Sequence, residues 1–578
     1  MEAQTRKCQN CKHDFTIEPN DFGFYEKIKV PPPTFCPDCR RQRRWAWRNN
    51  VSLYNRKCNL CEKSVISIYA PDSGLTIYCN KCWWSDKWDP KSYGVDYDFS
   101  KPFFTQFREL LQKVPQMAIV NDDGIASLNC EYTHDWWFSK NCYMCISGWH
   151  TENTMYSHFI LAGKNMVDCN IIRSESEWLY ECFMCSHCYQ VKNSEYNLAC
   201  IDSQFIFDCR DCSNCFMSYG LRGKKYHFKN KLYSKEQYEE IIKNYNLDTW
   251  VGVEQAQKEF DLFLLSYPRR FTQIFQSLNC TGNLISQAKN SKNCFIVKNA
   301  ENCSYCDYVG DTTKTTKDCY DLTTSGGLSE SYEGMVLDHS QLNLFGVFSV
   351  KSQDIQYTQH CHNVKHAIGC VGVRSSNYCI FNKQYTKEEY QRLLPKIIEH
   401  MNEMPYTDKQ GIEYKYGEFY PIEHSPFGYS ETFAQTLVPL KREEALKRGY
   451  KWQDNIQRTT GKETLKPKDI PESINDVKDD ILEEVLACID CGRNYKIVVN
   501  ELNFYRKMNI PIPRRCFHCR HATRLARQNP LKLWHRQCMC TLETHDHRDK
   551  CPNEFETSYA PDRPEMVYCE KCYQKEVY

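Results

Sequence analysis

The stretch Tyr180-Glu-Cys182-Phe-Met-Cys185-Ser-His-Cys188-Tyr189 decides the fold of the central region. It returns 27 residues later as Phe207-Asp-Cys209-Arg-Asp-Cys212-Ser-Asn-Cys215-Phe216. A shorter step of nine residues links Cys361, Cys370 and Cys379. Short segments that repeat at a fixed period are typical of a solenoid. We therefore expect a parallel β-helix over roughly residues 120–380, with the cysteines stacked as inward ladders.

The central region is itself duplicated. The segment Asn230-Lys-Leu-Tyr233-Ser-Lys-Glu-Gln-Tyr238 returns as Asn382-Lys-Gln-Tyr385-Thr-Lys-Glu-Glu-Tyr390. Each copy predicts the start of a helix, with Ser234 and Thr386 in the N-cap positions. A helix at the end of a solenoid also covers exposed strand edges. We therefore expect two solenoid halves, each closed by a helix.

The two ends of the chain carry the same cysteine module. Pairs of the form Cys-x2-Cys repeat after 480 positions, together with the aromatic and proline residues between them. Four thiolates with this spacing are the ligand set that tetrahedral zinc prefers. Three sites follow from the spacing: Cys8, Cys11, Cys36 and Cys39; Cys58, Cys61, Cys79 and Cys82; Cys488, Cys491, Cys516 and Cys519. Because protein thiolates fill every ligand position, these sites are expected to be structural and not hydrolytic.

The fourth site leaves alternatives open. Tyr69-Ala-Pro-Asp72 returns as Tyr559-Ala-Pro-Asp562, so the offset grows to 490 after a ten-residue insertion. Cys538 and Cys540 compete for the first ligand position, and His545 and His547 in the insertion could also bind. The predicted ligands are Cys540, Cys551, Cys569 and Cys572. About four structural Zn2+ ions are therefore expected in the chain.

A basic stretch follows the second cysteine pair of each module. Residues 39–48 read Cys-Arg-Arg-Gln-Arg-Arg-Trp-Ala-Trp-Arg, and residues 519–527 read Cys-Arg-His-Ala-Thr-Arg-Leu-Ala-Arg. Arginines with interleaved aromatic residues suit phosphate contact and base stacking. The competing interpretation is that these arginines pair with acidic side chains elsewhere in the chain. The residues predicted to contact RNA or DNA are Arg40, Arg41, Arg43, Arg44, Arg48, Arg520, Arg524 and Arg527.

The central cysteines also have two interpretations. Cys182, Cys185 and Cys188 have the spacing of metal ligands, but residues three apart in an extended chain point to opposite faces unless a turn intervenes. Cysteine also serves as a small apolar filler in a stacked core. We favour the filler, because the repeat architecture alone demands such ladders.

Composition narrows the class of protein. The chain has 578 residues, with 74 Lys+Arg against 73 Asp+Glu, so several domains and no whole-chain attraction to polyanions are expected. Its sequence has no apolar run of about 18 residues and begins without a secretory signal. In such a chain, 36 cysteines favour metal sites over disulfides, so a cytoplasmic location is expected. Walker, dinucleotide-binding, zinc-protease and serine-hydrolase motifs are missing from the sequence.

Each terminal module resembles the small family of zinc-ribbon domains. The pattern is carried by Cys8, Cys11, Phe15, Phe24-Tyr25, Pro33, Cys36, Cys39 and Arg40, and the copy from Cys488 to Arg520 fits it as well. Lys29-Val30 stands where the fuller ribbon has glycine. The resemblance covers roughly 70 residues, and it implies zinc binding and nothing about the centre. The whole chain is also similar to uncharacterised cysteine-rich proteins of ultra-small candidate-phylum bacteria, through Trp83-Trp84-Ser-Asp and the ending Ala560-Pro-Asp-Arg-Pro. That likeness implies no known activity.

Together these patterns predict a mainly β protein, with a duplicated parallel β-solenoid flanked by zinc-ribbon-like modules and short helices. The expected segments are a zinc module at 1–95, a solenoid half at 96–230, a helical insert at 231–275, a second half at 276–383, a helix and mixed segment at 384–452, a linker at 453–478 and a zinc module at 479–578. The leading hypothesis is a non-enzymatic zinc protein that binds nucleic acid or acts as a scaffold. The alternatives are a purely structural or protein-interaction solenoid with zinc caps and, last, a β-helix enzyme acting on a polymer.

Overall fold

The computed structural model describes residues 2–50, 52–310 and 314–577. The chain is mainly β and forms two compact units, each built from two separate stretches of sequence. We call residues 1–119 with 272–456 the N unit, and residues 120–271 with 457–578 the C unit. Each terminal module therefore belongs with the half of the central region that lies farther from it in sequence. Within the described ranges, every helix is too short or too polar to cross a membrane.

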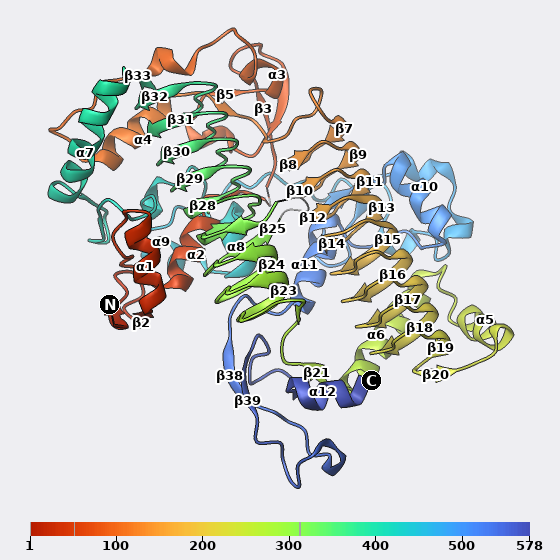
Figure 1. Ribbon diagram of the computed structural model, residues 1–578. Helices are drawn as coiled ribbons and strands as arrows, with labels where there is room; N and C mark the ends of the chain where they lie inside the picture. The colour runs from red at the N-terminus through yellow and green to blue at the C-terminus, as the bar shows by residue number, and fades with distance from the viewer. Residues whose placement is uncertain (1, 51, 311–313, 578) are drawn as a thin grey trace. The chain divides into compact units, whose positions relative to one another are not determined.

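The C unit contains a large, almost wholly parallel sheet (Figure 1). Neighbouring strands pair about twelve residues apart, as Lys140 does with Glu152, and the last strand turns back antiparallel. The strands are β7 (Leu128–Glu131), β8 (His134–Trp137), β9 (Lys140–Tyr143), β10 (Ile146–Trp149), β11 (Glu152–Met155), β12 (His158–Leu161), β13 (Gly163–Val167), β14 (Asn170–Ile172), β15 (Ser176–Phe183), β16 (Tyr189–Glu195), β17 (Ile201–Phe207), β18 (Ser213–Tyr219), β19 (Lys225–Phe228) and β20 (Lys231–Leu232).

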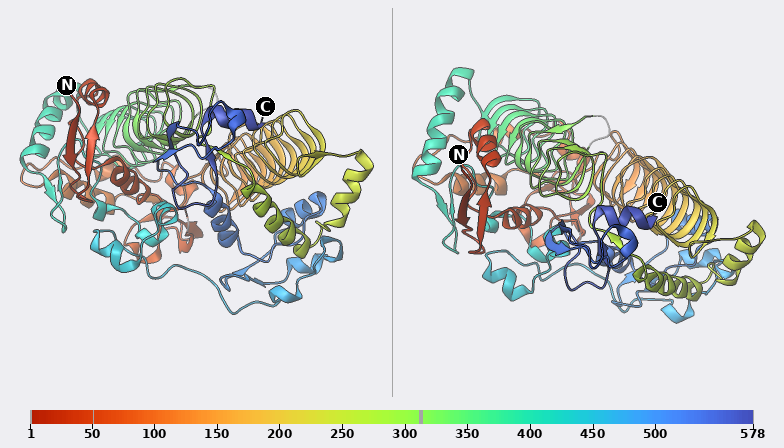
Figure 2. Two further views of the ribbon diagram at one scale, coloured as in Figure 1. Left: turned by 90° about the horizontal axis from the view of Figure 1, so that it is seen from below. Right: turned by 60° about the horizontal axis from the view of Figure 1, so that its bottom comes forward.

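The N unit contains a second sheet of the same kind. Its strands also pair about twelve residues apart, as Gln353 does with Lys365, and it too ends in an antiparallel strand. The strands are β22 (Ile274–Phe275), β23 (Gly282–Lys289), β24 (Cys294–Glu301), β25 (Asp307–Gly310), β26 (Thr316–Lys317), β27 (Tyr320–Thr323), β28 (Tyr332–Met335), β29 (Gln341–Leu344), β30 (Gln353–Gln356), β31 (Lys365–Ile368), β32 (Asn377–Ile380) and β33 (Lys383–Gln384). Figure 2 shows the successive turns of each sheet stacked on one another.

In both sheets, residues with a left-handed backbone conformation recur in runs at every third position. The run begins at Asn129, Tyr132, Asp135 and Phe138, whose φ angles lie between 51° and 55°. Each such residue turns the chain, so residues three apart face the same side instead of opposite sides. Asparagine tolerates this conformation and can bond along the stack. Asn129, Asn141, Asn153 and Asn165 do so, each amide bonding to the side chain one turn later.

The cysteines follow these corner residues and point inward. Cys182, Cys185 and Cys188 are buried in one core with Leu179 and Val191. The sequence offsets of 27 and 9 are both multiples of the three-residue step, whereas strands pair twelve residues apart. The offsets therefore identified inward positions but not the register of the sheet.

A helix packs beside the last turns of each sheet. In the C unit, α5 (Lys235–Asn244) is followed by α6 (Trp250–Leu265), and in the N unit the corresponding helix is α7 (Lys387–Glu403). Ser234 and Thr386 are the N-caps of α5 and α7, as predicted, and each accepts a bond from the backbone N–H three residues later.

The N-terminal module consists of two small hairpins and short helices. Its elements are β1 (Gln4–Lys7), β2 (Asp14–Ile17), α1 (Pro19–Lys27), α2 (Pro37–Trp45), β3 (Tyr54–Lys57), β4 (Ser64–Ser67), β5 (Ile77–Tyr78) and α3 (Asn80–Trp83). The rest of the N unit adds α4 (Phe103–Lys113), β6 (Gln116–Met117), β34 (Tyr406–Thr407), β35 (Glu413–Tyr414), α8 (Phe433–Leu437) and α9 (Arg442–Lys447). Helix α4 buries one apolar face, which includes Phe103, Phe107 and Leu110.

The C-terminal module repeats this plan. Its elements are β36 (Leu486–Ala487), β37 (Asn494–Tyr495), α10 (Val499–Met508), α11 (Phe517–Arg527), β38 (Trp534–Gln537), β39 (Glu554–Thr557), β40 (Val567–Tyr568) and α12 (Glu570–Val577), and β40 pairs with β21 (Arg269–Arg270). A single 3-10 turn, Asp479–Leu482, precedes the strand β36.

Candidate metal centres and docking helices

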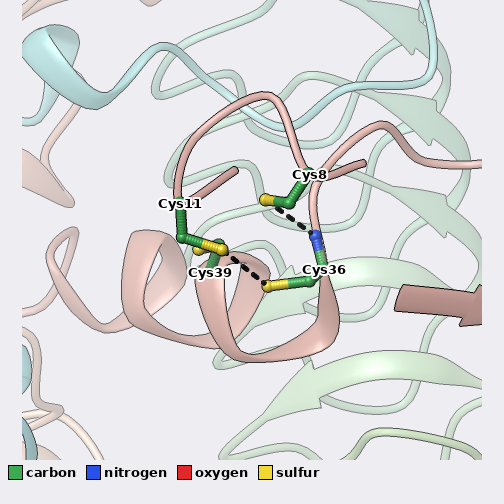
Figure 3. A group of neighbouring side chains, drawn as sticks. All are labelled: Cys8, Cys11, Cys36 and Cys39. Atoms are coloured by element: carbon green, nitrogen blue, oxygen red, sulfur yellow. Dashed lines mark hydrogen bonds between the residues drawn. The ribbon is translucent and has the colours of Figure 1, made fainter. Parts of the chain in front are cut away.

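The first cysteine site is formed by a hairpin and a helix start (Figure 3). Cys8 follows β1, Cys11 lies in the turn before β2, and Cys36 is the N-cap residue of α2, which also carries Cys39. The backbone N–H of Cys36 donates to Cys8 Sγ over 3.2 Å, and Cys11 Sγ lies 3.7 Å from Cys36 Sγ. Two thiols are thus brought to the start of a helix, where free N–H groups favour negative charge.

The spacing of sulfurs is that of a metal site. Among the residues that the structure describes, four groups of four cysteines, which we call the tetracysteine groups, bring all their Sγ atoms within 4.8 Å of one another. Three groups are those predicted from spacing: Cys8, Cys11, Cys36 and Cys39; Cys58, Cys61, Cys79 and Cys82; Cys488, Cys491, Cys516 and Cys519. Each could hold a metal ion through protein ligands alone.

Backbone donors prepare one thiol in two of these groups for ionisation. Burial opposes the charged form of Cys58, but backbone N–H groups of Cys79 and Cys61 outweigh it and lower its pKa to about 7. Burial and N–H donors act in the same way on Cys488, whose pKa is also lowered to about 7. The thiolate is the form that binds metal, so Cys58 and Cys488 are the thiols of these two groups that are prepared for ligation near neutral pH.

The fourth group differs from the prediction by one ligand. It contains Cys538, Cys551, Cys569 and Cys572, and Cys540 lies outside it. Cys538 follows β38 as Cys58 follows β3, and the N–H of Cys569 donates to Cys538 Sγ over 3.2 Å. The same bond joins Cys79 to Cys58 in the N unit.

Local sequence carried a signal for this ligand. Arg56-Lys57 precedes Cys58, and Arg536-Gln537 precedes Cys538 at the unchanged offset of 480. The insertion that shifts the offset to 490 comes only after this position, so the first ligand keeps its register.

Cys540 belongs to a second, smaller group. Its sulfur lies with His547 and Cys572 within 4.8 Å, so Cys572 is common to this group and to the fourth tetracysteine group. His545 approaches as well, with Nδ1 at 3.2 Å from Cys540 Sγ.

Helix α2 lies beside the N-unit sheet (Figure 1). Its arginines are buried there. Arg40 pairs with Asp321 at 2.9 Å, and Arg44 pairs with the same carboxylate at 3.1 Å. Arg43 lies between Glu333 at 2.7 Å and Glu418 at 3.2 Å. Burial opposes the charge of Arg40, but its carboxylate partner outweighs it and raises the pKa of Arg40.

The remaining predicted contacts of this module are also enclosed. Arg41 reaches Asp307 at 3.6 Å and lies over the ring of Phe295, and Arg48 is fully buried and donates to Asn50 at 2.8 Å. Their burial in the folded N unit favours internal pairing of these side chains, and their contact with RNA or DNA stays a prediction.

The arginines of α11 make the same kind of contacts with the C-unit sheet. Arg520 pairs with Asp168 at 3.1 Å, and Arg524 lies 2.9 Å from both Asp168 and Glu181. Arg527 is 30% exposed and pairs with Glu195 at 2.5 Å. Each predicted arginine in this helix thus has an acidic partner, as the competing interpretation proposed. The basic stretch is a docking surface within the unit.

The central cysteines have hydrogen-bond partners in the backbone. Cys182 Sγ lies 3.3 Å from the carbonyl of Val191, and Cys185 Sγ lies 3.5 Å from that of Ser194. Within the described part of the chain, no three central cysteines come within 4.8 Å of one another as the terminal groups do. Their burial in the apolar core agrees with the role of filler.

A cavity in the C unit lies between β15, β16, α6 and α11. Its carboxylates are paired: Glu181 with Arg524, Glu195 with Arg527 and Glu254 with Arg515. Burial raises the pKa of Glu181 above its ordinary value, and its partner Arg524 opposes that shift. The polymer-cleaving alternative stays a prediction.

Comparison with known proteins leaves the family open, since no family model and no curated protein matches the sequence. Among solved structures, the chain matches a candidate acetyltransferase from Desulfovibrio desulfuricans G20 at 9% identity. The match covers 46% of this chain and 70% of that one, with a TM-score of 0.10. A score this low carries no argument about fold or function.

Proposed function

We propose that the chain is a non-enzymatic, zinc-stabilised scaffold. Four zinc ions fold the terminal modules, and each module clamps onto the side of a β-solenoid. The observation that carries the proposal is the set of four tetracysteine groups. Four sulfurs bound about 2.3 Å from a tetrahedral zinc lie about 3.8 Å apart. The paired sulfurs lie 3.7 Å apart in the first and third groups and 3.9 Å apart in the second and fourth.

The ligand type favours zinc among the metals that proteins use. Four thiolates in a tetrahedral arrangement select zinc or an iron–sulfur centre, and the resemblance of both modules to zinc ribbons favours zinc. A site with four protein ligands contributes folding energy and leaves no position for a reacting water.

The solenoid interpretation rests on the register and on the corners of both sheets. Parallel pairing at a step of about twelve residues, with a left-handed residue at every third position, winds the chain into stacked turns. Such a stack of turns provides a long, rigid surface. The arginine helices fix one module on each stack, so the scaffold would hold protein partners on the sides that the modules leave open.

Metal content tests the zinc part of this proposal. Protein purified with zinc should contain at least four ions per chain by plasma mass spectrometry. Cys61→Ser should remove one ion, whereas Cys280→Ser, at a half-buried cysteine outside the groups, should remove none. Equal zinc content in both variants would contradict the assignment of the tetracysteine groups.

Oligonucleotide binding tests the choice between scaffold and nucleic-acid binder. Because the arginines of both helices are paired internally, zinc-loaded protein should show no salt-sensitive binding to mixed RNA and DNA oligonucleotides. Affinity that falls steeply as salt rises would show that phosphates are contacted, and the nucleic-acid function would then replace the scaffold.

A further inference from the structure

We propose that the last zinc site is binuclear: Cys540, His547 and Cys572 hold a second ion, and the thiolate of Cys572 bridges it to the ion of the tetracysteine group. The inference rests on the proposed zinc sites and adds a ligand set to one of them. Its three donor atoms lie within 4.8 Å of one another, and two of the residues are buried.

The donor distances fit a shared ion. Zinc binds sulfur at about 2.3 Å and histidine nitrogen at about 2.0–2.1 Å, so a tetrahedral angle places the two donors about 3.6 Å apart. The distance from Cys572 Sγ to His547 Nε2 is 3.6 Å. The pair thus already has the separation that one zinc ion would impose.

The orientation of His547 is that of a ligand. Its Nδ1 lies 2.6 Å from the backbone carbonyl of Asp549, so this nitrogen carries the proton and donates it. Nε2 is then the unprotonated nitrogen, and it faces Cys572. Metal-binding histidines usually donate their other ring N–H in this way, which fixes both the tautomer and the ring plane.

His545 contacts Cys540 and orients its thiol. Its Nδ1 lies 3.2 Å from Cys540 Sγ, and its Nε2 lies 3.6 Å from a carboxylate oxygen of Glu576. This chain of carboxylate, imidazole and sulfur is the arrangement by which a second layer of residues orients a ligand. His545 is therefore a positioning residue in this proposal, and Cys540 is the ligand.

The insertion explains why only this site gains an ion. In the N unit, the first cysteine pair of the corresponding site is Cys58-Asn-Leu-Cys61. In the C unit, ten additional residues separate Cys538 from Cys551 and bring Cys540 and both histidines. The four ligands Cys538, Cys551, Cys569 and Cys572 remain in place, so the insertion adds donors to a complete site.

The second ion differs from the others in its ligands. Three protein donors leave one position of a tetrahedral zinc to water or another small ligand. We therefore expect this ion to exchange fastest and to be the first one that a chelator removes from the full-length protein.

The test counts ions and asks whether two of them share a thiolate. Zinc-loaded full-length protein should contain five ions per chain, and His547→Ala and Cys540→Ser should each contain four. His535→Ala is the matched control: this histidine is 63% exposed, is paired with Glu554 and Glu556, and should leave five ions. Circular dichroism should show that His547→Ala remains folded.

Cadmium-113 NMR of the reconstituted protein tests the bridge. Two cadmium resonances should be split by mutual coupling through Cys572, and His547→Ala should remove both the splitting and one resonance. Four ions in the wild type, an unchanged count in His547→Ala, or five ions without coupling would each overturn the proposal. Even if the second ion were absent, the loss of one ion from Cys61→Ser would show that the tetracysteine groups bind metal.

Discussion

The two units hold their modules with the same residues at corresponding positions. In the N unit, Arg40 pairs with Asp321; in the C unit, Arg520, which lies 480 positions later, pairs with Asp168. The agreement extends to tyrosines that donate to module carboxylates over 2.9 Å: Tyr305 to Asp21 and Tyr156 to Glu501, the module residues again 480 positions apart. Module and sheet were thus duplicated together with the contact that joins them.

The differences show which contacts the docking needs. Arg44 and Arg524 correspond and both reach the aspartate that the first arginine binds. The position of Arg43, which is held between two glutamates, is occupied by Thr523 in the C unit. Both module–sheet contacts therefore share one pair of arginines on the docking helix, whereas the other contacts differ between the two units.

Loss of a zinc ligand should have the largest effect and should affect the two units alike. Cys8→Ser and Cys488→Ser each remove one thiolate from corresponding sites. Structural zinc contributes on the order of 10 kcal/mol to the folding of small modules, so each variant should lose one ion and the fold of its own module. Metal analysis and limited proteolysis would measure both losses. A module that stays protease-resistant without its ion would contradict a structural role.

Removal of the shared arginine should come next. Arg40→Ala and Arg520→Ala each remove one of the two arginines that pair with a fully buried aspartate. Breaking a buried ion pair typically destabilises a protein by about 3–5 kcal/mol, and the remaining arginine should keep the loss near the lower end of that range. Chemical denaturation should show a loss of this order in either variant. Arg442→Ala is the control, because Arg442 and Asp454 are half exposed and such pairs contribute about 0–1 kcal/mol.

The two variants would also test the docking interpretation. If Arg40→Ala and Arg520→Ala kept full stability but weakened oligonucleotide binding, the arginines would be ligand contacts. If only one variant were destabilised, the equivalence of the two units would be limited to geometry.

The two units should differ in their response to acid, because different residues occupy corresponding positions of their sheets: His360 of the N unit lies 152 residues after Asp208 of the C unit. Burial lowers the pKa of His360 to about 3, so His360 is neutral in the folded N unit. Because the unfolded chain binds this proton near pH 6.5, the stability is complete above that pH and is lost as pH falls toward 3. The loss amounts to about 3 kcal/mol at pH 4.

His360→Phe should remove this component of the acid sensitivity. Its unfolding free energy should change less between pH 7 and pH 4 than that of the wild type. His366→Phe, at a half-exposed position in the same sheet, should behave like the wild type. Equal acid sensitivity in His360→Phe and wild type would show that the buried imidazole does not control it.

The sequence predicted more of the local structure than of the contacts between segments. The Cys-x2-Cys spacing identified three tetracysteine groups, and the helix-start motifs identified the caps of α5 and α7, because ligand geometry and capping act over a few residues. Docking joins residues such as Arg40 and Asp321, which lie 281 positions apart, and no local pattern encodes it. The arginines therefore suggested a ligand, although their partners were elsewhere in the same chain.

The smallest expected loss of stability comes from substitutions at the left-handed corner residues, where both units have asparagine ladders. Asn141 and Asn290 are left-handed residues within asparagine ladders of the C-unit and N-unit sheets. Asn→Ala at either position keeps the β-carbon in this left-handed conformation but removes the amide whose hydrogen bonds compensate for it, so each variant should lose about 1–2 kcal/mol. Asn→Gly restores the backbone freedom and isolates the bonds, and it should lose about 1 kcal/mol or less. Thermal unfolding of the four variants gives the comparison. If glycine is as destabilising as alanine at both positions, the ladder and not the corner stabilises the stack; if only one unit responds, the two stacks differ in what their corners contribute.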